Sequence, residues 1–457
     1  MDTMYLGTED VKRLLLRLLP PSICAQLVTM LYNLVDRIYI GRLPEGEWSI
    51  AAIGIITPVV TIITAVTALL GNGGAPLCAI RLGRGDVDGA EKVLGSSFTM
   101  LLLSSVGIMA VVLHFLTPIL ILFGATDQTM ADARAYLQTY VMGTTFIQIA
   151  VGINPYINTQ GFTRVGMCSV LTGCILNLVL DPVFIFWLKM GVRGAALATV
   201  ISQFASAVFA LGFLFSSKSI LHIRPRYLTP EPRIVLDIMK MGFSPFVMKL
   251  TGGLLLMNFN RQLLRFGGDL AVSAMSVLTS VWNFLELPSH GITDGAQPIL
   301  GYNLGAKKYA RVRETFRVEL MVNTVYCLAF YLLVLAMPEL FVRMFNSSPA
   351  LMEMAVPMMK IYLFGAVVFG AFMTCQQTYL ALGFPKYSFL FACVRKIVIL
   401  IPLIYLLPYL LRQKVYAVVL AEPIADIVST ILNCVFFWKF YQKVLPAEEF
   451  PSVEETI

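Results

Sequence analysis

Four oxygen-bearing side chains fall at one depth within the apolar segments of this sequence. Asn177 and Asp181 are four residues apart, so they share one face of a helix. Thr199 falls at the same level of the next apolar segment, and Asp36 lies near the end of the first. Two carboxylates, an amide and a hydroxyl are hard oxygen ligands, suited to Na⁺ or to a proton on a carboxyl group. A carboxylate inside hydrocarbon is costly, so we expect a cation site here rather than hydrogen bonds that only join helices.

Motifs for other energy sources and for catalysis are missing from the sequence. Neither GxxxxGK[ST] nor GxGxxG occurs, which argues against nucleotide hydrolysis and against a dinucleotide cofactor. The three histidines form no HExxH pattern, and the eight cysteines lie in or beside apolar runs without a CxxC pattern. We therefore expect no catalytic residues, no enzyme activity and no cofactor, and we expect a gradient of H⁺ or Na⁺ to supply the energy.

The elements that position these residues must be membrane helices. Hydrophobic residues make up 58% of the 457-residue chain and charged residues 13%, which is typical of a polytopic membrane protein. Apolar runs of spanning length predict an all-α fold of twelve transmembrane helices. The predicted helices cover approximately residues 14–40, 49–71, 91–116, 131–156, 164–188, 193–216, 236–262, 270–294, 311–337, 353–379, 388–410 and 415–440.

Two prolines interrupt the first of these helices. Pro20 and Pro21 lie inside its apolar run, where proline removes a backbone hydrogen bond and bends a helix. We therefore expect a bend that changes when Asp36 gains or loses a cation.

Positive charge is distributed unevenly along the chain. If the N-terminus is cytoplasmic, about two thirds of the Lys and Arg residues lie on the cytoplasmic side, which supports cytoplasmic N- and C-termini. The formal net charge of +7 is better explained by Lys and Arg residues that set the orientation of the helices in the membrane than by nucleic-acid binding. We expect a multi-pass protein of the plasma (cytoplasmic) membrane that contacts the lipid bilayer and binds no nucleic acid.

The two halves of the sequence repeat. Adding 222 to a residue number in the first half gives its counterpart in the second, as for Gly73 and Gly295 or Tyr140 and Tyr362. Six helices return the chain to its starting side, so the repeats are parallel and related by a pseudo-two-fold axis along the membrane normal. Two such lobes are typical of an alternating-access transporter. The expected domains are a first lobe (1–216) with the cation site, a cytoplasmic linker (217–233), a second lobe (234–443) and an acidic cytoplasmic tail (444–457).

The repeat also predicts that coupling involves only the first lobe. The counterparts of Asn177, Asp181 and Thr199 are apolar, and only Asp36 keeps a polar counterpart, in Asn258. The three apolar counterparts are Ile399, Leu403 and Ala421.

Charged residues of the second lobe have no counterparts in the first. Lys249 and Glu286 fall at similar depths on neighbouring helices, which predicts a neutralised pair. Alternatively, Glu286 faces the cleft between the lobes and attracts cationic substrates. Arg395 and Asp426, assisted by Glu422, are expected to stabilise the lobe. The candidate substrate-cleft residues are Asn33, Asn154, Asn158, Met257, Trp282 and Glu286, with Phe259, Phe284 and Phe372 as further aromatic candidates. For any single aromatic or Met residue among them, packing against lipid is the stronger expectation.

Nearly the whole chain resembles the multidrug and toxin extrusion (MATE) family. The segments that carry the resemblance are LYNLVDRIYIGR, GAPLCAIRLGRGD, NLVLDPVFIF, GVRGAALAT and GAQPILGYNLGA. It implies an N-lobe cation site at Asp36, Asn177, Asp181 and Thr199, with Tyr32 four residues before Asp36 and a bending proline at Pro21. It also implies cation-coupled efflux of amphipathic, often cationic, organic compounds by a protein that works as a monomer.

One difference from the family pattern limits which branch of the family the chain resembles. Some members carry a second acidic site on helices 7 and 10, whereas helix 10 here has only Glu353 at its end and helix 7 has Lys249. The chain is therefore more similar to the DinF-like and MepA-like branch, whose site lies in the N-lobe.

Two other transporter classes share this architecture. The segment 81–84 resembles a loop motif of the major facilitator superfamily, but Ile80 replaces the expected acid. A flippase for a lipid-linked saccharide or another amphipathic lipid precursor is the closer alternative. We would expect many Arg and Lys residues in its cleft to bind pyrophosphate, and mid-membrane cations are few here.

Overall fold

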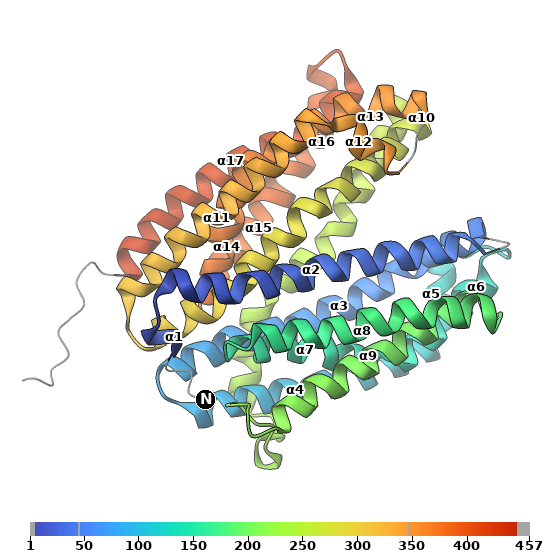
Figure 1. Cartoon of the computed structure of the whole chain (residues 1–457). Helices are drawn as coiled ribbons and strands as arrows, with labels where there is room; N and C mark the ends of the chain where they lie inside the picture. The colour runs from blue at the N-terminus through green and yellow to red at the C-terminus, as the bar shows by residue number, and fades with distance from the viewer. Residues whose placement is uncertain (1–4, 44–45, 346–347, 446–457) are drawn as a thin grey trace, which may run out of the picture. The chain divides into compact units, whose positions relative to one another are not determined.

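The computed structural model describes residues 5–43, 46–345 and 348–445, which form helices joined by short connections (Figure 1). No strand occurs in these three ranges, so the expected all-α membrane fold is confirmed. The elements up to the linker are α1 (Tyr5–Thr8), α2 (Val11–Gly41), α3 (Gly46–Gly83), α4 (Val87–His114), α5 (Leu116–Leu122), α6 (Met130–Met142), α7 (Thr144–Thr159), α8 (Thr163–Pro182), the π-helix η1 (Val183–Trp187), α9 (Gly191–Phe215) and the 3₁₀ turn η2 (Pro225–Tyr227).

The second half of the chain contains the remaining helices. They are α10 (Pro232–Gly305), α11 (Tyr309–Ala336), α12 (Pro338–Arg343), α13 (Pro349–Tyr362), the 3₁₀ turn η3 (Leu363–Gly365), α14 (Ala366–Ala381), α15 (Pro385–Cys393), the π-helix η4 (Val394–Leu400), α16 (Ile401–Leu410) and α17 (Lys414–Val444).

Ten spans in the described ranges are long and apolar enough to cross a membrane. One of them, α10, is two helices that meet at Gly268, where the backbone leaves the helical region (φ 66°, ψ −164°). A left-handed φ favours glycine, so Gly268 permits the sharp reversal. Counting α10 as two helices, and α6 with α7 as one broken span, gives the twelve that the sequence predicts.

The chain forms two compact units whose boundaries lie inside helices. Among the described residues, unit 1 contains residues from Pro20 to Leu82 and from Asp86 to Leu250, and unit 2 contains those up to Leu19, the turn 83–85 and those from Thr251 onward. The expected linker, 217–233, therefore lies wholly within unit 1. α2 is continuous through Pro20 and Pro21, and these prolines stand where it passes from unit 2 to unit 1.

Close contacts explain why each unit includes a segment from the other half of the sequence. In unit 1, Gly73 of α3 and Gly242 of α10 have no side chains, and each lies directly against the backbone of the other helix. In unit 2, the amide of Asn303 donates to the carbonyl of Leu6 at 2.9 Å, and Arg311 donates to that of Glu9 at 2.5 Å. The start of the first repeat therefore belongs to unit 2, and the start of the second repeat belongs to unit 1.

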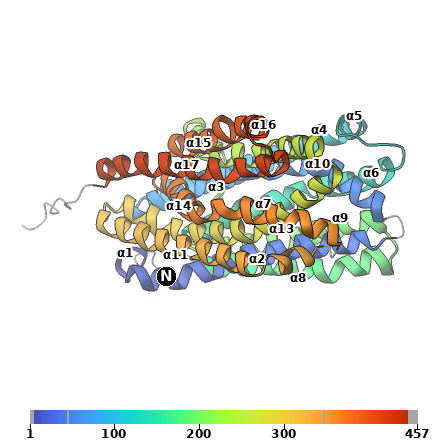
Figure 2. The same cartoon turned by 90° about the horizontal axis from the view of Figure 1, so that it is seen from above.

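Each unit has its own apolar core. In unit 1, α8 and α9 lie side by side in both views, and α9 also packs on α6 and α7 (Figures 1 and 2). Core residues there include Ile40, Leu137 and Tyr140. In unit 2, α14 packs between α11 and α17, around residues such as Trp282 and Phe369.

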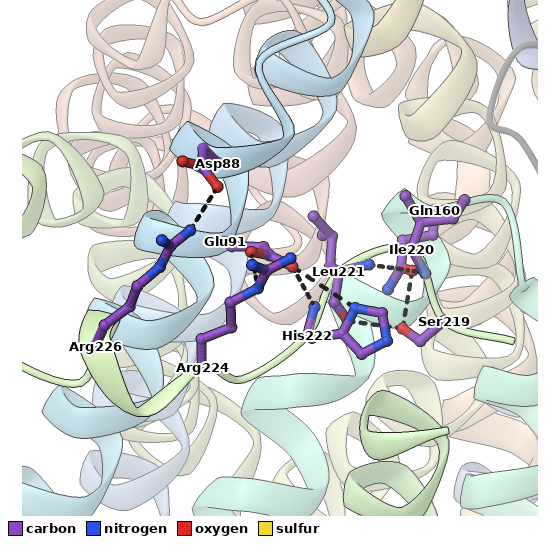
Figure 3. A network of polar contacts seen from close by, with 9 residues as sticks. All are labelled: Asp88, Glu91, Gln160, Ser219, Ile220, Leu221, His222, Arg224 and Arg226. Carbon is purple, nitrogen blue, oxygen red and sulfur yellow. Dashed lines mark hydrogen bonds and ion pairs between the residues drawn. The ribbon is translucent and has the colours of Figure 1, made fainter. Parts of the chain in front are cut away.

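The segment 216–231 joins α9 to α10 and is held against unit 1 by polar contacts; we call it the strap. Its Arg224 forms an ion pair with the fully buried Glu91 of α4 (Nε–Oε2, 2.6 Å), and Arg226 pairs with Asp88 (2.9 Å) (Figure 3). The backbone N–H of His222 donates to Glu91 Oε1 at 3.1 Å. The strap is therefore fixed to the first turns of α4.

Gln160, at the end of α7, holds the other end of the strap (Figure 3). Its Oε1 accepts hydrogen bonds from Ile220 N (2.7 Å), Leu221 N (3.0 Å) and Ser219 Oγ (3.1 Å). A buried carbonyl oxygen with three donors satisfies backbone groups that would otherwise lose their hydrogen bonds in the protein interior. The strap is thus an integral part of unit 1.

Candidate functional site

The predicted cation-site residues come together inside unit 1. Asn177 and Asp181 lie on the last turns of α8, just before η1, and Thr199 faces them from α9. The three residues are 2%, 0% and 4% exposed. Single-turn π-helices occur often at functional sites, because they shift the side chains beside them out of regular helical register.

Asn177 joins the two helices through its amide. In the orientation that satisfies both of its polar atoms, its nitrogen donates to Asp181 Oδ2 at 3.0 Å, and its oxygen accepts the Thr199 N–H at 3.3 Å. The Thr199 hydroxyl donates to the carbonyl of Ala195 at 3.1 Å. The amide therefore presents a donor, not an oxygen ligand, to the carboxyl group.

Asp36 and Tyr32 complete this cluster from α2. The carboxyl groups of Asp36 and Asp181 lie within hydrogen-bonding reach of each other, and the Tyr32 hydroxyl contacts Thr199. Two ionised carboxyl groups that interact in this way repel each other unless a cation or a shared proton lies between them. We call Tyr32, Asp36, Asn177, Asp181 and Thr199 the acidic site.

Two tyrosines of α6 belong to this neighbourhood, and the sequence analysis missed them. Tyr136 interacts electrostatically with Asp36, Asp181 and Tyr32, and its ring stacks on Tyr140 (centroids 5.9 Å apart). Their spacing of four residues places both on one face of the helix predicted at 131–156, and this spacing is the signal in the sequence that marks them.

Unit 2 has no equivalent acidic site at the repeat positions. Asn258, the counterpart of Asp36, accepts a hydrogen bond from the Tyr405 hydroxyl at 2.7 Å, and its amide donates to Leu254 O within its own helix. Ile399 and Leu403 are partly buried and pack against the apolar core, which also contains Ala421.

A buried charge network occupies another part of unit 2. Arg395, in η4, pairs with Asp426 (Nε–Oδ1, 2.5 Å) and with Glu422 (3.0 Å), both from α17. Its guanidinium also lies over the rings of Phe369 and Phe372, at 5.5 and 5.4 Å from their centroids. All three charged side chains are less than a tenth exposed, so each depends on the others for neutralisation.

Glu286 and Lys249 belong to different units. The carboxyl group of Glu286 is about one-third exposed and lies 3.8 Å from His290 Nε2, one turn further along α10. Lys249 lies at the end of unit 1. Their pairing stays a prediction.

The other candidate cleft residues have varied surroundings. Asn33 donates to Thr29 O within α2, and Asn158 donates to Asn154, whose own amide donates to Gly166 O of α8 at 2.9 Å. Met257 is largely exposed. Trp282, by contrast, is buried in the core of unit 2, against Tyr362 and Phe369, instead of lining an open surface.

Comparison with known proteins identifies relatives over almost the full chain. The model of the MatE family matches residues 21–183 and 249–406. The multidrug export protein MepA of Staphylococcus saprophyticus is 23% identical over 430 residues, which cover 94% of each chain. MepA of Staphylococcus aureus (strain MRSA252) is 23% identical over 432 residues, with the same coverage.

Solved structures share the fold. An outward-facing multidrug resistance MATE family transporter of the MOP superfamily superimposes with a TM-score of 0.92, at 22% identity, over 97% of this chain and 99% of that one. A MOP superfamily transporter from Pyrococcus furiosus, whose binding pocket is described as reversed in polarity, gives 0.90 at the same identity and coverage. At this identity, the likeness establishes the two-lobe fold and leaves the substrate to be argued from the site.

Proposed function

Because the chain belongs to the MatE family of membrane transporters, we propose that it is a secondary active antiporter that exports amphipathic, often cationic, organic compounds. The observation that carries this proposal is the acidic site, in which Asp36 and Asp181 contact each other inside unit 1. A pair of interacting acids within a membrane span, one of them fully buried, can couple cation binding to a change of conformation.

We propose that the coupling ion is a proton. A single proton shared by Asp36 and Asp181 relieves the repulsion between them and supplies their hydrogen bond. Na⁺ would instead favour an amide oxygen directed at the ion, whereas the Asn177 nitrogen points at Asp181. Tyr32 interacts with Asp36, Tyr136 interacts with both acids, and Tyr140 stacks on Tyr136, so aromatic side chains lie beside the pair.

Export is proposed to follow alternating access between the two units, with the monomer as the working form and both termini in the cytoplasm. The names of the Staphylococcus relatives support a broad range of exported drugs. Glu286 is the proposed attraction point for cationic compounds because its carboxyl group is partly exposed. Protonation of the acidic site would change the packing of α2 against α8 and α9, and so favour one state over the other.

Vesicles containing the purified protein provide the test. We expect uphill transport of a cationic dye with an imposed proton gradient, no transport with a Na⁺ gradient alone, and loss of uphill transport in Asp36→Asn. Asp127→Asn, which changes an exposed acid between α5 and α6, is the matched control and should transport like the wild type.

Three results would contradict the proposal. Transport driven by Na⁺ at constant pH would show that the coupling ion is Na⁺ and not a proton. Uphill export by Asp36→Asn at the wild-type rate would show that the acidic site does not couple the ion to export. Movement of a lipid-linked saccharide across the vesicle membrane, with no drug transport in either gradient, would favour the flippase alternative.

A further inference from the structure

Unit 2 contains a buried acid that neither the acidic site nor the Arg395 network uses. Glu319 of α11 is 1% exposed, and neither of its carboxyl oxygens has a hydrogen-bond partner within the described residues. A buried carboxylate without hydrogen-bond partners is much more costly than a buried neutral polar group without partners, because nothing replaces the water that the charge loses on burial. The side chain therefore needs a bound cation or a proton.

The groups around Glu319 increase this need. Asp294 of α10 interacts with it electrostatically, and the two acids lie at similar depth, each about three turns from the short connection between α10 and α11. From α14, which packs on α11, the titratable group that interacts with it is Cys375. Across the described part of the chain, no basic side chain is among these interacting groups. The interactions described for Glu319 itself therefore supply no positive charge that would stabilise its ionised form.

The repeat shows that packing alone does not require an acid at this place. Subtracting 222 from Glu319 gives Ser97, whose hydroxyl donates to the carbonyl of Leu70. The hydroxyl of Tyr156 donates to the same carbonyl at 3.3 Å. The counterpart of Asp294 is Asn72. Neutral groups thus satisfy the equivalent position in unit 1, and only unit 2 has two acids there.

We propose that Glu319 and Asp294 form a second proton-binding site, separate from the acidic site of unit 1, in which the Glu319 carboxyl group carries the proton. A proton fits better than a metal ion, because a metal ion would require several further oxygen ligands around the pair. In this arrangement each unit holds its own pair of acids, at positions that do not correspond in the repeat. The proposal extends the proton coupling proposed above, but the following test does not depend on transport.

Infrared spectroscopy of the full-length protein in lipid tests the site directly, because a protonated carboxyl group has a carbonyl band distinct from that of a carboxylate. We expect the wild type to show this band at neutral pH. In Glu319→Gln the band should lose the share of its intensity that one carboxyl group contributes. Glu314→Gln, an acid-to-amide change on the same helix, is the matched control and should leave this share unchanged. The band should persist in Asp36→Asn, which separates this site from the acidic site.

Glu319→Ser, which introduces the residue found in the other repeat, provides a second variant if the glutamine variant does not fold. Equal bands in the wild type and in a folded Glu319 variant would overturn the proposal. A band that appears only after Na⁺ is removed would also overturn it, because the site would then bind Na⁺.

Discussion

Removing Arg395 should destabilise unit 2 more than removing any exposed arginine. Arg395 is the cation that neutralises Glu422 and Asp426, and all three side chains are buried. Arg395→Met keeps much of the aliphatic volume but removes the one cation that is ion-paired with both buried carboxylates among the described residues. The effect should therefore arise from unpaired charge and not from a cavity.

The expected loss can be worked out from these contacts. Breaking a buried ion pair by removing one partner costs about 3–5 kcal/mol. The unpaired carboxylates can escape part of this penalty by taking up a proton, which for an ordinary carboxyl group at pH 7 costs about 4 kcal/mol. The two estimates agree, so we expect the free energy of unfolding to fall by about 4 kcal/mol in Arg395→Met.

The assay is reversible unfolding of the purified protein by a denaturing detergent. Combining Arg395→Met with Glu422→Gln and Asp426→Asn removes all three charges, and should restore stability to within about 1.5 kcal/mol of the wild type. Arg265→Met removes an exposed arginine whose Nη1 donates to the Tyr409 hydroxyl at 3.1 Å, and serves as the control. If the triple variant is no more stable than Arg395→Met, the reasoning from unpaired charge is wrong.

Three further predictions concern unit 1 and its repeat. Asn258→Ala should reduce ion-driven export far less than Asp36→Ala, because the counterparts of Asn177, Asp181 and Thr199 in the second repeat are apolar; equal losses in vesicles would contradict this. Tyr136→Phe should leave folding intact but shift the pH dependence of export, since its hydroxyl interacts with both acids; superimposable pH profiles would exclude that role. Gln160→Ala should increase hydrogen exchange at the amides of 220–221, where each unsatisfied buried donor costs about 1–3 kcal/mol. Amides within α10 are the control, and unchanged protection at 220–221 would show that other groups hold the strap.

The positions of the helices could be predicted from the sequence because hydrocarbon requires long apolar runs, and these are local properties. The constant offset of 222 residues likewise predicts the two-lobe architecture. The break between α6 and α7 could not be predicted in the same way. It occurs at Gly143, which packs directly against Val200 of α9, so a contact distant in sequence determines it.

Four members of the acidic site were predictable because they are oxygen-bearing side chains that share one depth in the first repeat, whereas Tyr32 was indicated only by the family resemblance. Tyr136 was missed because aromatic residues are common in apolar helices and carry no comparable signal. Glu91 and Gln160 were missed for a different reason. Both residues bind backbone and side-chain groups of the strap that are more than 55 residues away in the sequence. No local pattern in the sequence reveals such contacts.

The division of α2 and α10 between the units makes the two repeats depend on each other. Adding 222 to Val11, where α2 begins, gives Arg233 at the start of α10, so the two segments that join the opposite unit are equivalent parts of the duplicated sequence. Such a reciprocal exchange is what two identical chains perform in domain swapping. Either repeat alone would therefore lack the first helical segment of its unit, because the other repeat supplies that segment.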